Sequence, residues 1–206
     1  MLRFFLTTFF LIILTGIACF TDEPKPMEYH FPDEFGLDKE VFLGQKISTL
    51  LHQNIIKAEE DYGFRYVLTT PNKNYYWFQI HNNENKDNYV RGIEVWIDYN
   101  SSENHPTIRN LLDALIRQNG ENYKIYDSYS DSSASFFGYH LLYILWDLSD
   151  QVKLVVNYAP IEYYNKKRFP ICFVVKAIDI SNKDTDDFYW NKCTESTFWT
   201  KERLLE

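Results

Sequence analysis

The sequence has no strong basic cluster, few glycines and prolines, and three cysteines in 206 residues. Its longest Lys/Arg run is Lys166–Arg168 in a chain of net charge −8, which argues against nucleic acid and anionic lipid headgroups as electrostatic partners. The cysteines and the five histidines show no zinc-ligand spacing. The sequence therefore predicts no metal site, no cofactor and no nucleic-acid partner.

Catalytic motifs are also missing. Serines are plentiful between residues 130 and 135, beside Asp131 and His140, but no GxSxG pattern surrounds them. The acidic runs Glu59–Asp61 and Asp184–Asp187 do not have the spacing of a calcium loop. We therefore predict no catalytic residue.

The amino terminus has the layout of an export signal. Arg3 is followed by the apolar stretch Phe4–Leu14 and then by small residues that end at Cys19. The stretch is shorter than the roughly 20 residues that a membrane-spanning helix needs. We predict that residues 1–18 are a signal peptide.

Two fates for Cys19 remain open. The run Leu14–Cys19 is similar to a loose bacterial lipobox, which predicts an acylated Cys19, with Gly16 where a lipobox prefers Leu. Gly16 and Ala18 equally suit an ordinary signal peptidase, which predicts secretion. In the first case residues 19–36 are a tether to the inner or outer membrane, and the protein faces the periplasm or the cell surface.

The other two cysteines suit an oxidising compartment. Cys172 lies in the apolar run Phe169–Ile180, and Cys193 follows a polar segment. A disulfide between them would tie the C-terminal tail to a core strand. The alternative is that Cys172 is a small buried apolar side chain and Cys193 a surface thiol.

The clearest predicted element is a helix over Pro106–Gln118. Its apolar residues recur at helical spacing, and Asn119–Gly120 ends it. A second helical segment is predicted over Asp38–Glu60, either as one helix or as a short element up to Ser48 followed by a helix.

Strands are predicted after each helical segment because aromatic and β-branched residues alternate there with polar ones. In the third strand Ile93, Val95 and Ile97 point to one face, and Glu94, Trp96 and Asp98 point to the other. The predicted strands are Phe64–Thr70, Tyr75–His81, Tyr89–Tyr99, Tyr123–Tyr129, Phe136–Asp147, Lys153–Tyr158 and Phe169–Ile180.

This order predicts an α+β fold, an antiparallel sheet with helices packed on one face. We expect a single domain over residues 37–190 and a C-terminal tail over residues 181–206. The domain divides into possible halves at residues 37–100 and 101–180, one running helix then three strands and the other helix then four, as in a degenerate duplication.

A family resemblance rests on the same order. It is carried by Leu43–Ile47 before the first helix, the helix-ending Gly63 and Gly120, and the strand pair Tyr143–Asp147 with Lys153–Val156. Over residues 38–180 the chain resembles the helix-plus-sheet modules of periplasmic lipoproteins, such as the barrel-assembly lipoprotein family, and in tandem the beta-lactamase inhibitor protein family. The resemblance implies a tandem α+β fold and transfers no binding residue.

Aromatic residues exceed what one core face can hide, since neighbouring rings on a strand point to opposite faces. We predict that exposed rings bind a protein or carbohydrate partner. The expected function is that of an exported, lipid-anchored cell-envelope protein that acts as a non-catalytic binding or structural module. The alternative is a secreted hydrolase with a site built from separated residues. The predicted binding residues are Tyr75, Trp77, Trp96, Tyr163 and Tyr164.

Overall fold

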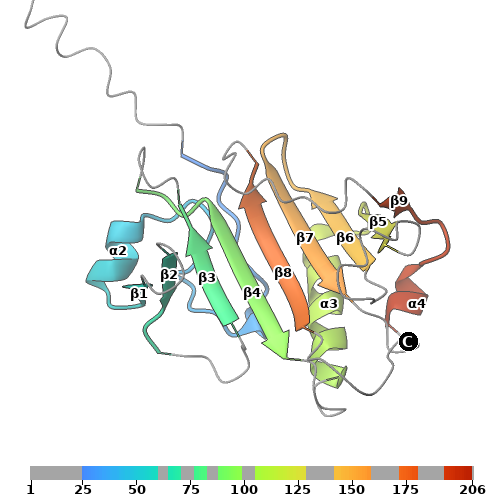
Figure 1. Ribbon diagram of the computed structural model, residues 1–206, viewed down its shortest axis with the longest axis horizontal. Coiled ribbons are helices and arrows are strands. Elements are labelled where there is room, and N and C mark those ends of the chain that lie inside the picture. The colour runs from blue at the N-terminus through green and yellow to red at the C-terminus, as the bar shows by residue number, and fades with distance from the viewer. Residues whose placement is uncertain are drawn as a thin grey trace, which may run out of the picture.

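The computed structural model describes residues 25–59, 65–70, 77–82, 88–98, 105–128, 142–158, 172–180 and 193–205. In these residues nine strands form one antiparallel sheet of order β1-β2-β3-β4-β8-β7-β6-β5-β9 (Figure 1). The strands are β1 (Ile56–Glu59), β2 (Arg65–Leu68), β3 (Trp77–His81), β4 (Gly92–Asp98), β5 (Lys124–Asp127), β6 (Leu142–Asp147), β7 (Val152–Tyr158), β8 (Cys172–Asp179) and β9 (Thr194–Glu195). The helices are η1 (Asp33–Phe35), α2 (Ile47–His52), α3 (His105–Asn119) and α4 (Lys201–Leu205).

The sheet consists of two meanders joined at its centre. Strands β1 to β4 follow α2, strands β5 to β8 follow α3, and β4 pairs with β8 over seven residue pairs from Gly92↔Ile178 to Asp98↔Cys172. Each half thus runs from a helix into four strands, one more strand in the first half than predicted. The predicted α+β class with an antiparallel sheet is confirmed.

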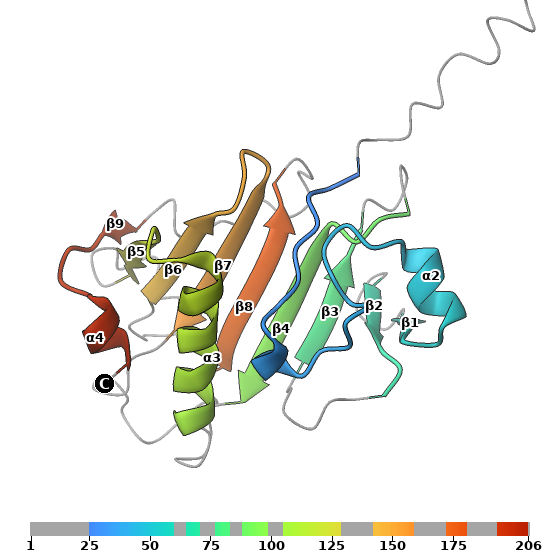
Figure 2. The ribbon, with the colours of Figure 1, turned by 180° about the vertical axis from the view of Figure 1, so that it is seen from behind.

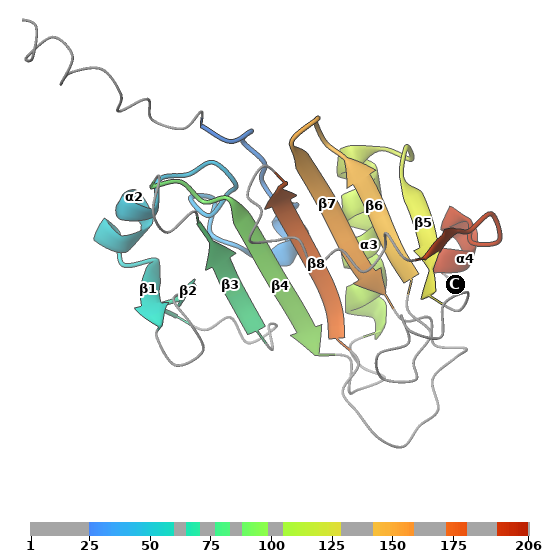
Figure 3. The same cartoon turned by 45° about the horizontal axis from the view of Figure 1, so that its top comes forward.

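Helix α3 lies across strands β6 to β8 on one face of the sheet (Figures 2 and 3). Its apolar stripe of Ile108, Leu111, Leu112, Leu115 and Ile116 is at most 3% exposed and joins one core with the inward side chains of β3 to β8. A core of this kind forms because the helix stripe and the alternating strand residues each bury an apolar face against the other. This confirms the predicted helix and the inward direction of Ile93, Val95 and Ile97.

Gly120 ends α3 where the sequence predicts. Its φ of 80° is in the left-handed region, which favours glycine, and its N–H donates to the Ile116 carbonyl at 2.8 Å. The Gly120 carbonyl then accepts from the indole Nε1 of buried Trp146 at 2.9 Å. The helix end is therefore held against β6 as well as capped.

The predicted helical segment over Asp38–Glu60 is wrong for most of its length. Helix α2 has only six residues, and Asn54, with a φ of 58°, follows it in the left-handed conformation. Ile56 then begins β1 and is buried beside Leu68 of β2. The β-branched pair Ile55 and Ile56 suits a pleated strand better than a helix, and long-range pairing with β2 settles the choice.

The first and last described segments of the chain both contribute to the core. Tyr29, Phe31 and Phe35, expected in the tether, are at most 8% exposed. Trp199 and Leu204, expected in the tail, are 7% and 0% exposed. The core therefore includes side chains from residues 29–35 and 199–204, so part of the expected tether and part of the expected tail belong to the folded domain.

A buried ion pair joins the two halves of the sheet at the β4–β8 junction. Arg91 Nη1 donates to Asp179 Oδ2 at 2.6 Å, and the side chains are 4% and 0% exposed. The Asp179 N–H also donates to the Arg91 carbonyl at 2.8 Å. Side chain and backbone together thus fix the register between the start of β4 and the end of β8.

Candidate functional site

The strongest candidate site lies on the face of the sheet opposite α3, which we call the open face; it is toward the viewer in Figure 1. Cross-strand register assembles it: Trp77 of β3 stands directly opposite Trp96 of β4, and the next row pairs Gln79 with Glu94. Lys176 of β8 is the partner of Glu94 on its other side. These residues alternate with core residues on their strands, so their side chains share one face.

Glu94 is the centre of this site. Its side chain is 5% exposed, and its Oε2 accepts from Gln79 Nε2 at 2.8 Å. Its Oε1 accepts from the indole Nε1 of Trp96 and lies 2.9 Å from Lys176 Nζ. The ring Nε2 of His81 is 3.4 Å from Oε2. A buried carboxylate with this many donors satisfies the requirement that a buried charge be paired and hydrogen-bonded.

These contacts control the ionisation of Glu94. Burial by itself raises the pKa of Glu94, but the hydrogen bond from His81, the charge of Lys176 and the hydrogen bonds from Lys176 and Trp96 together lower it to about 2. Glu94 is therefore an anion at neutral pH with its lone pairs already engaged. Its role in the site is to hold in place the side chains that donate hydrogen bonds to it, among them Gln79 and Trp96.

Both indoles of the site are held in place. Trp77 Nε1 donates to Gln79 Oε1 at 3.3 Å, while Gln79 Nε2 donates to Glu94, so the amide is oriented by a pure donor and a pure acceptor. The Arg65 guanidinium lies 3.9 Å from the centre of the Trp77 ring and donates from Nε to Glu59 Oε2 at 2.8 Å. Cation–π contact and hydrogen bond therefore restrict the Trp77 ring.

Gly92 leaves the room that His81 needs. The two residues are cross-strand partners, and a Cβ at position 92 would lie 3.3 Å from both Cβ and Cδ2 of His81. A side chain at this position would crowd His81, which would have to shift by a few tenths of an ångström.

Of the predicted binding residues, the structure brings Trp77 and Trp96 together, both partly exposed. Tyr75, Tyr163 and Tyr164 lie outside the described residues, as does Cys19. Sequence analysis missed Gln79, His81, Glu94 and Lys176. Polar residues at the centre of otherwise apolar strands are a usable signal, but only the register shows that they meet.

The predicted disulfide disagrees with the sheet order. Strands β7, β6 and β5 lie between β8, which begins at Cys172, and β9, which follows Cys193. Four strand spacings of about 4.8 Å place these strands roughly 19 Å apart, whereas a disulfide needs Cα atoms within about 7 Å. Cys193 instead packs against a second apolar cluster, formed by Tyr143, Leu145 and Val155 on the open face.

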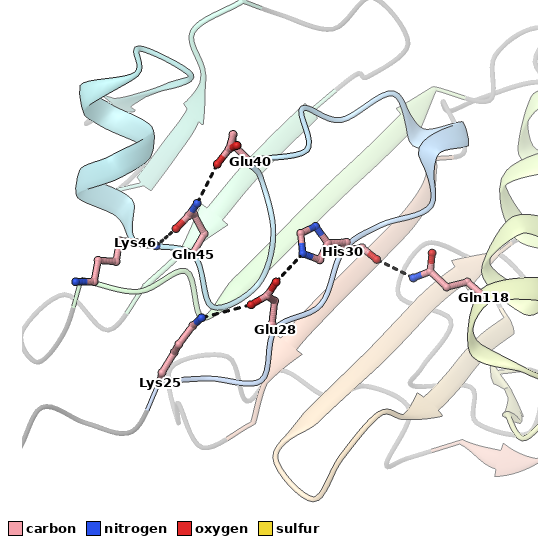
Figure 4. Close-up of polar contacts among 7 residues, drawn as sticks. All are labelled: Lys25, Glu28, His30, Glu40, Gln45, Lys46 and Gln118. Atoms are coloured by element: carbon pink, nitrogen blue, oxygen red, sulfur yellow. Dashed lines mark hydrogen bonds and ion pairs between the residues drawn. The ribbon is translucent and has the colours of Figure 1, made fainter.

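The other candidate site lies on the face of the sheet that carries α3. It is an open cleft of about 930 Å³ between α3 and the segment of residues 30–41. Figure 4 shows contacts at residues that line or adjoin it: Gln118 Nε2 donates to the His30 carbonyl at 2.7 Å, and the His30 ring lies 3.0 Å from Glu28. Arg117 also reaches across the cleft to Glu34 at 2.7 Å. These contacts hold the segment of residues 30–41 against α3. We therefore interpret the cleft as a packing boundary within the fold, and the open face as the stronger candidate site.

The described residues were also considered as a metal site and as a membrane span. No three His, Cys, Asp or Glu side chains converge there as a metal site would require. Among the same residues, no helix combines the length and apolar composition needed to cross a bilayer.

Comparison with protein-family models, curated proteins and solved structures finds no match. The resemblance to tandem lipoprotein modules therefore stays a prediction.

Proposed function

We propose that this is an exported protein, anchored to the cell envelope through Cys19, that binds a ligand on its open face without transforming it. The observation that carries the proposal is the pair Trp77 and Trp96, directly opposite each other, partly exposed, and oriented through Gln79 and Glu94. Aromatic side chains fixed before binding lose little conformational entropy when a ligand arrives.

A secreted hydrolase is the alternative, and the proximity of His81 to Glu94 is the observation in its favour. A general base works best with a pKa near the operating pH. The pKa of about 2 makes Glu94 a weak proton acceptor, and its donors occupy the oxygens that a reacting group would need. These properties support binding over catalysis.

Anchoring is tested by replacing the predicted acylation site. We expect Cys19→Ala to move the protein from the membrane fraction to the soluble exported fraction, since a lipid chain contributes about 0.8 kcal/mol per buried methylene group. Mass spectrometry of the native amino terminus should show an acylated Cys19. Cys193→Ala is the matched control and should stay with the membrane. An unmodified mature terminus would contradict anchoring.

Binding is tested by truncating the two indoles. We expect Trp77→Ala and Trp96→Ala each to weaken retention of a solubilised envelope component by tenfold or more, as truncation of a central aromatic anchor does. Surface plasmon resonance with the immobilised mature chain measures the loss, and thermal unfolding shows whether each variant is folded.

The exposed aromatic Phe198 is the matched control because its side chain lies outside the site. Phe198→Ala should leave retention unchanged. If both tryptophan variants remain folded and retain every component as the native chain does, the open face is not the binding site.

A further inference from the structure

We propose that the ligand of the open face is an uncharged saccharide, an inference that rests on the proposed function and names its ligand class. The first reason is the way the indoles are held. The N–H edge of each ring is engaged within the protein, at Gln79 Oε1 for Trp77 and at Glu94 Oε1 for Trp96. With the Arg65 guanidinium over the Trp77 ring, the carbon surface that the site offers a ligand lies chiefly on Trp96, and it suits the C–H face of a sugar ring.

Hydrogen-bonding groups border this carbon surface. The ammonium group of Lys176 has three N–H donors. It contacts Glu94 Oε1, and the Lys176 side chain is 33% exposed. Asn157 lies in the same cross-strand row as Trp96, one strand beyond Val174, and its amide both donates and accepts. Hydroxyl groups need partners of both kinds. The site thus combines an aromatic surface with the polar groups that hydroxyls bind.

The charges of the site cancel, which points to a neutral ligand. Lys176 is paired with Glu94, and Arg65 is paired with Glu59. An anionic or cationic ligand would have to break one of these pairs or bind without a counter-charge. A neutral saccharide needs neither, so its binding should depend little on salt.

Burial of the neighbouring apolar side chains argues against a protein partner. A stable protein interface buries about 800 Å² on each side around an apolar centre. On the open face Tyr143, Leu145 and Val155 are at most 5% exposed, and Val174 and Ile178 are 6% and 5% exposed. These five side chains therefore offer little apolar surface for the centre of a protein interface.

The experiment is a tryptophan-fluorescence titration of the mature full-length chain with purified oligosaccharides. The probes are maltohexaose, cellohexaose and chitohexaose in its N-acetylated form, with an oligogalacturonate as the acidic comparator. We expect saturable quenching by at least one neutral probe, with an affinity that changes little from low to high salt. Trp96→Ala should weaken that affinity tenfold or more, and Phe198→Ala should leave it unchanged.

Trp96→Phe keeps a ring without the indole N–H and should retain part of the affinity; it also reports on the site if Trp96→Ala does not fold. The inference is overturned if no neutral probe binds, if only the acidic probe binds, or if the folded Trp96 variants bind as the native chain does. If an envelope protein is retained through Trp77 and Trp96 while the oligosaccharides fail, the saccharide inference falls and the proposed binding function stands.

Discussion

Asp179→Ala is expected to lower the free energy of unfolding by about 3–5 kcal/mol, because it removes the carboxylate that faces a buried guanidinium. Arg91 and Asp179 are almost completely buried, and their contact spans the junction between the two meanders. The substitution leaves the positive charge of Arg91 in an apolar environment without this partner. Urea unfolding monitored by circular dichroism measures the change.

The control replaces both members of the pair. Arg91→Met with Asp179→Leu removes both charges and fills similar volume, and such replacements are often close to neutral in stability. The double variant should therefore be more stable than Asp179→Ala, and a double-mutant cycle gives the coupling. If the single and double variants lose the same stability, the ion pair does not join the halves in the way described.

The second large effect is a fall in the free energy of unfolding at acidic pH. The pKa of Glu94 in the folded protein is about 2 against an ordinary value of 4.5, so the folded state favours the ionised form more than the unfolded chain does. The stabilisation is fully present above pH 4.5 and is lost as the pH falls toward 2. The difference of about 2.5 pH units corresponds to about 3 kcal/mol. Urea unfolding at a series of pH values from 6 to 2 should show this loss.

Two substitutions assign the acid effect to Glu94. Glu94→Gln removes the ionisable group, so the free energy of unfolding should fall less steeply between pH 5 and 2 than in the native chain. Lys176→Met removes a charge that lowers the pKa of folded Glu94, so the loss of stability should be smaller and should be complete at a higher pH than in the native chain. Parallel curves for the native chain and Glu94→Gln would show that another group controls acid stability.

Elements with strong periodicity were predictable. Helix α3 has five apolar residues at helical spacing and a glycine immediately after its end, and all seven predicted strands coincide with observed strands. Their patterns are local properties, since an amphipathic helix or a half-buried strand shows its period within about ten residues. The α+β class follows from the order of these elements.

Elements that depend on distant partners were missed. Strand β1 exists because Ile56 packs beside Leu68 of β2, and β9 has only two residues, paired with Tyr126 and Asp127 of β5. Tyr29 and Trp199 are buried from opposite ends of the chain. No local pattern distinguishes such aromatic residues from exposed ones. Propensity is too weak a guide where packing against remote segments decides the outcome.

The sequence by itself determined the helix over α3, the alternation along the strands, and that Trp77 and Trp96 lie on faces away from the core. Each of these depends on the spacing of residues close together in the chain. Only the tertiary structure decided that these two tryptophans face each other and that Gln79 and Lys176 meet at Glu94, because antiparallel register sets which residues are neighbours. The same register keeps Cys172 and Cys193 apart. The physical reason is that cross-strand contacts join residues far apart in the chain, such as positions 94 and 176. The helical and strand periods relate only residues that are close in sequence.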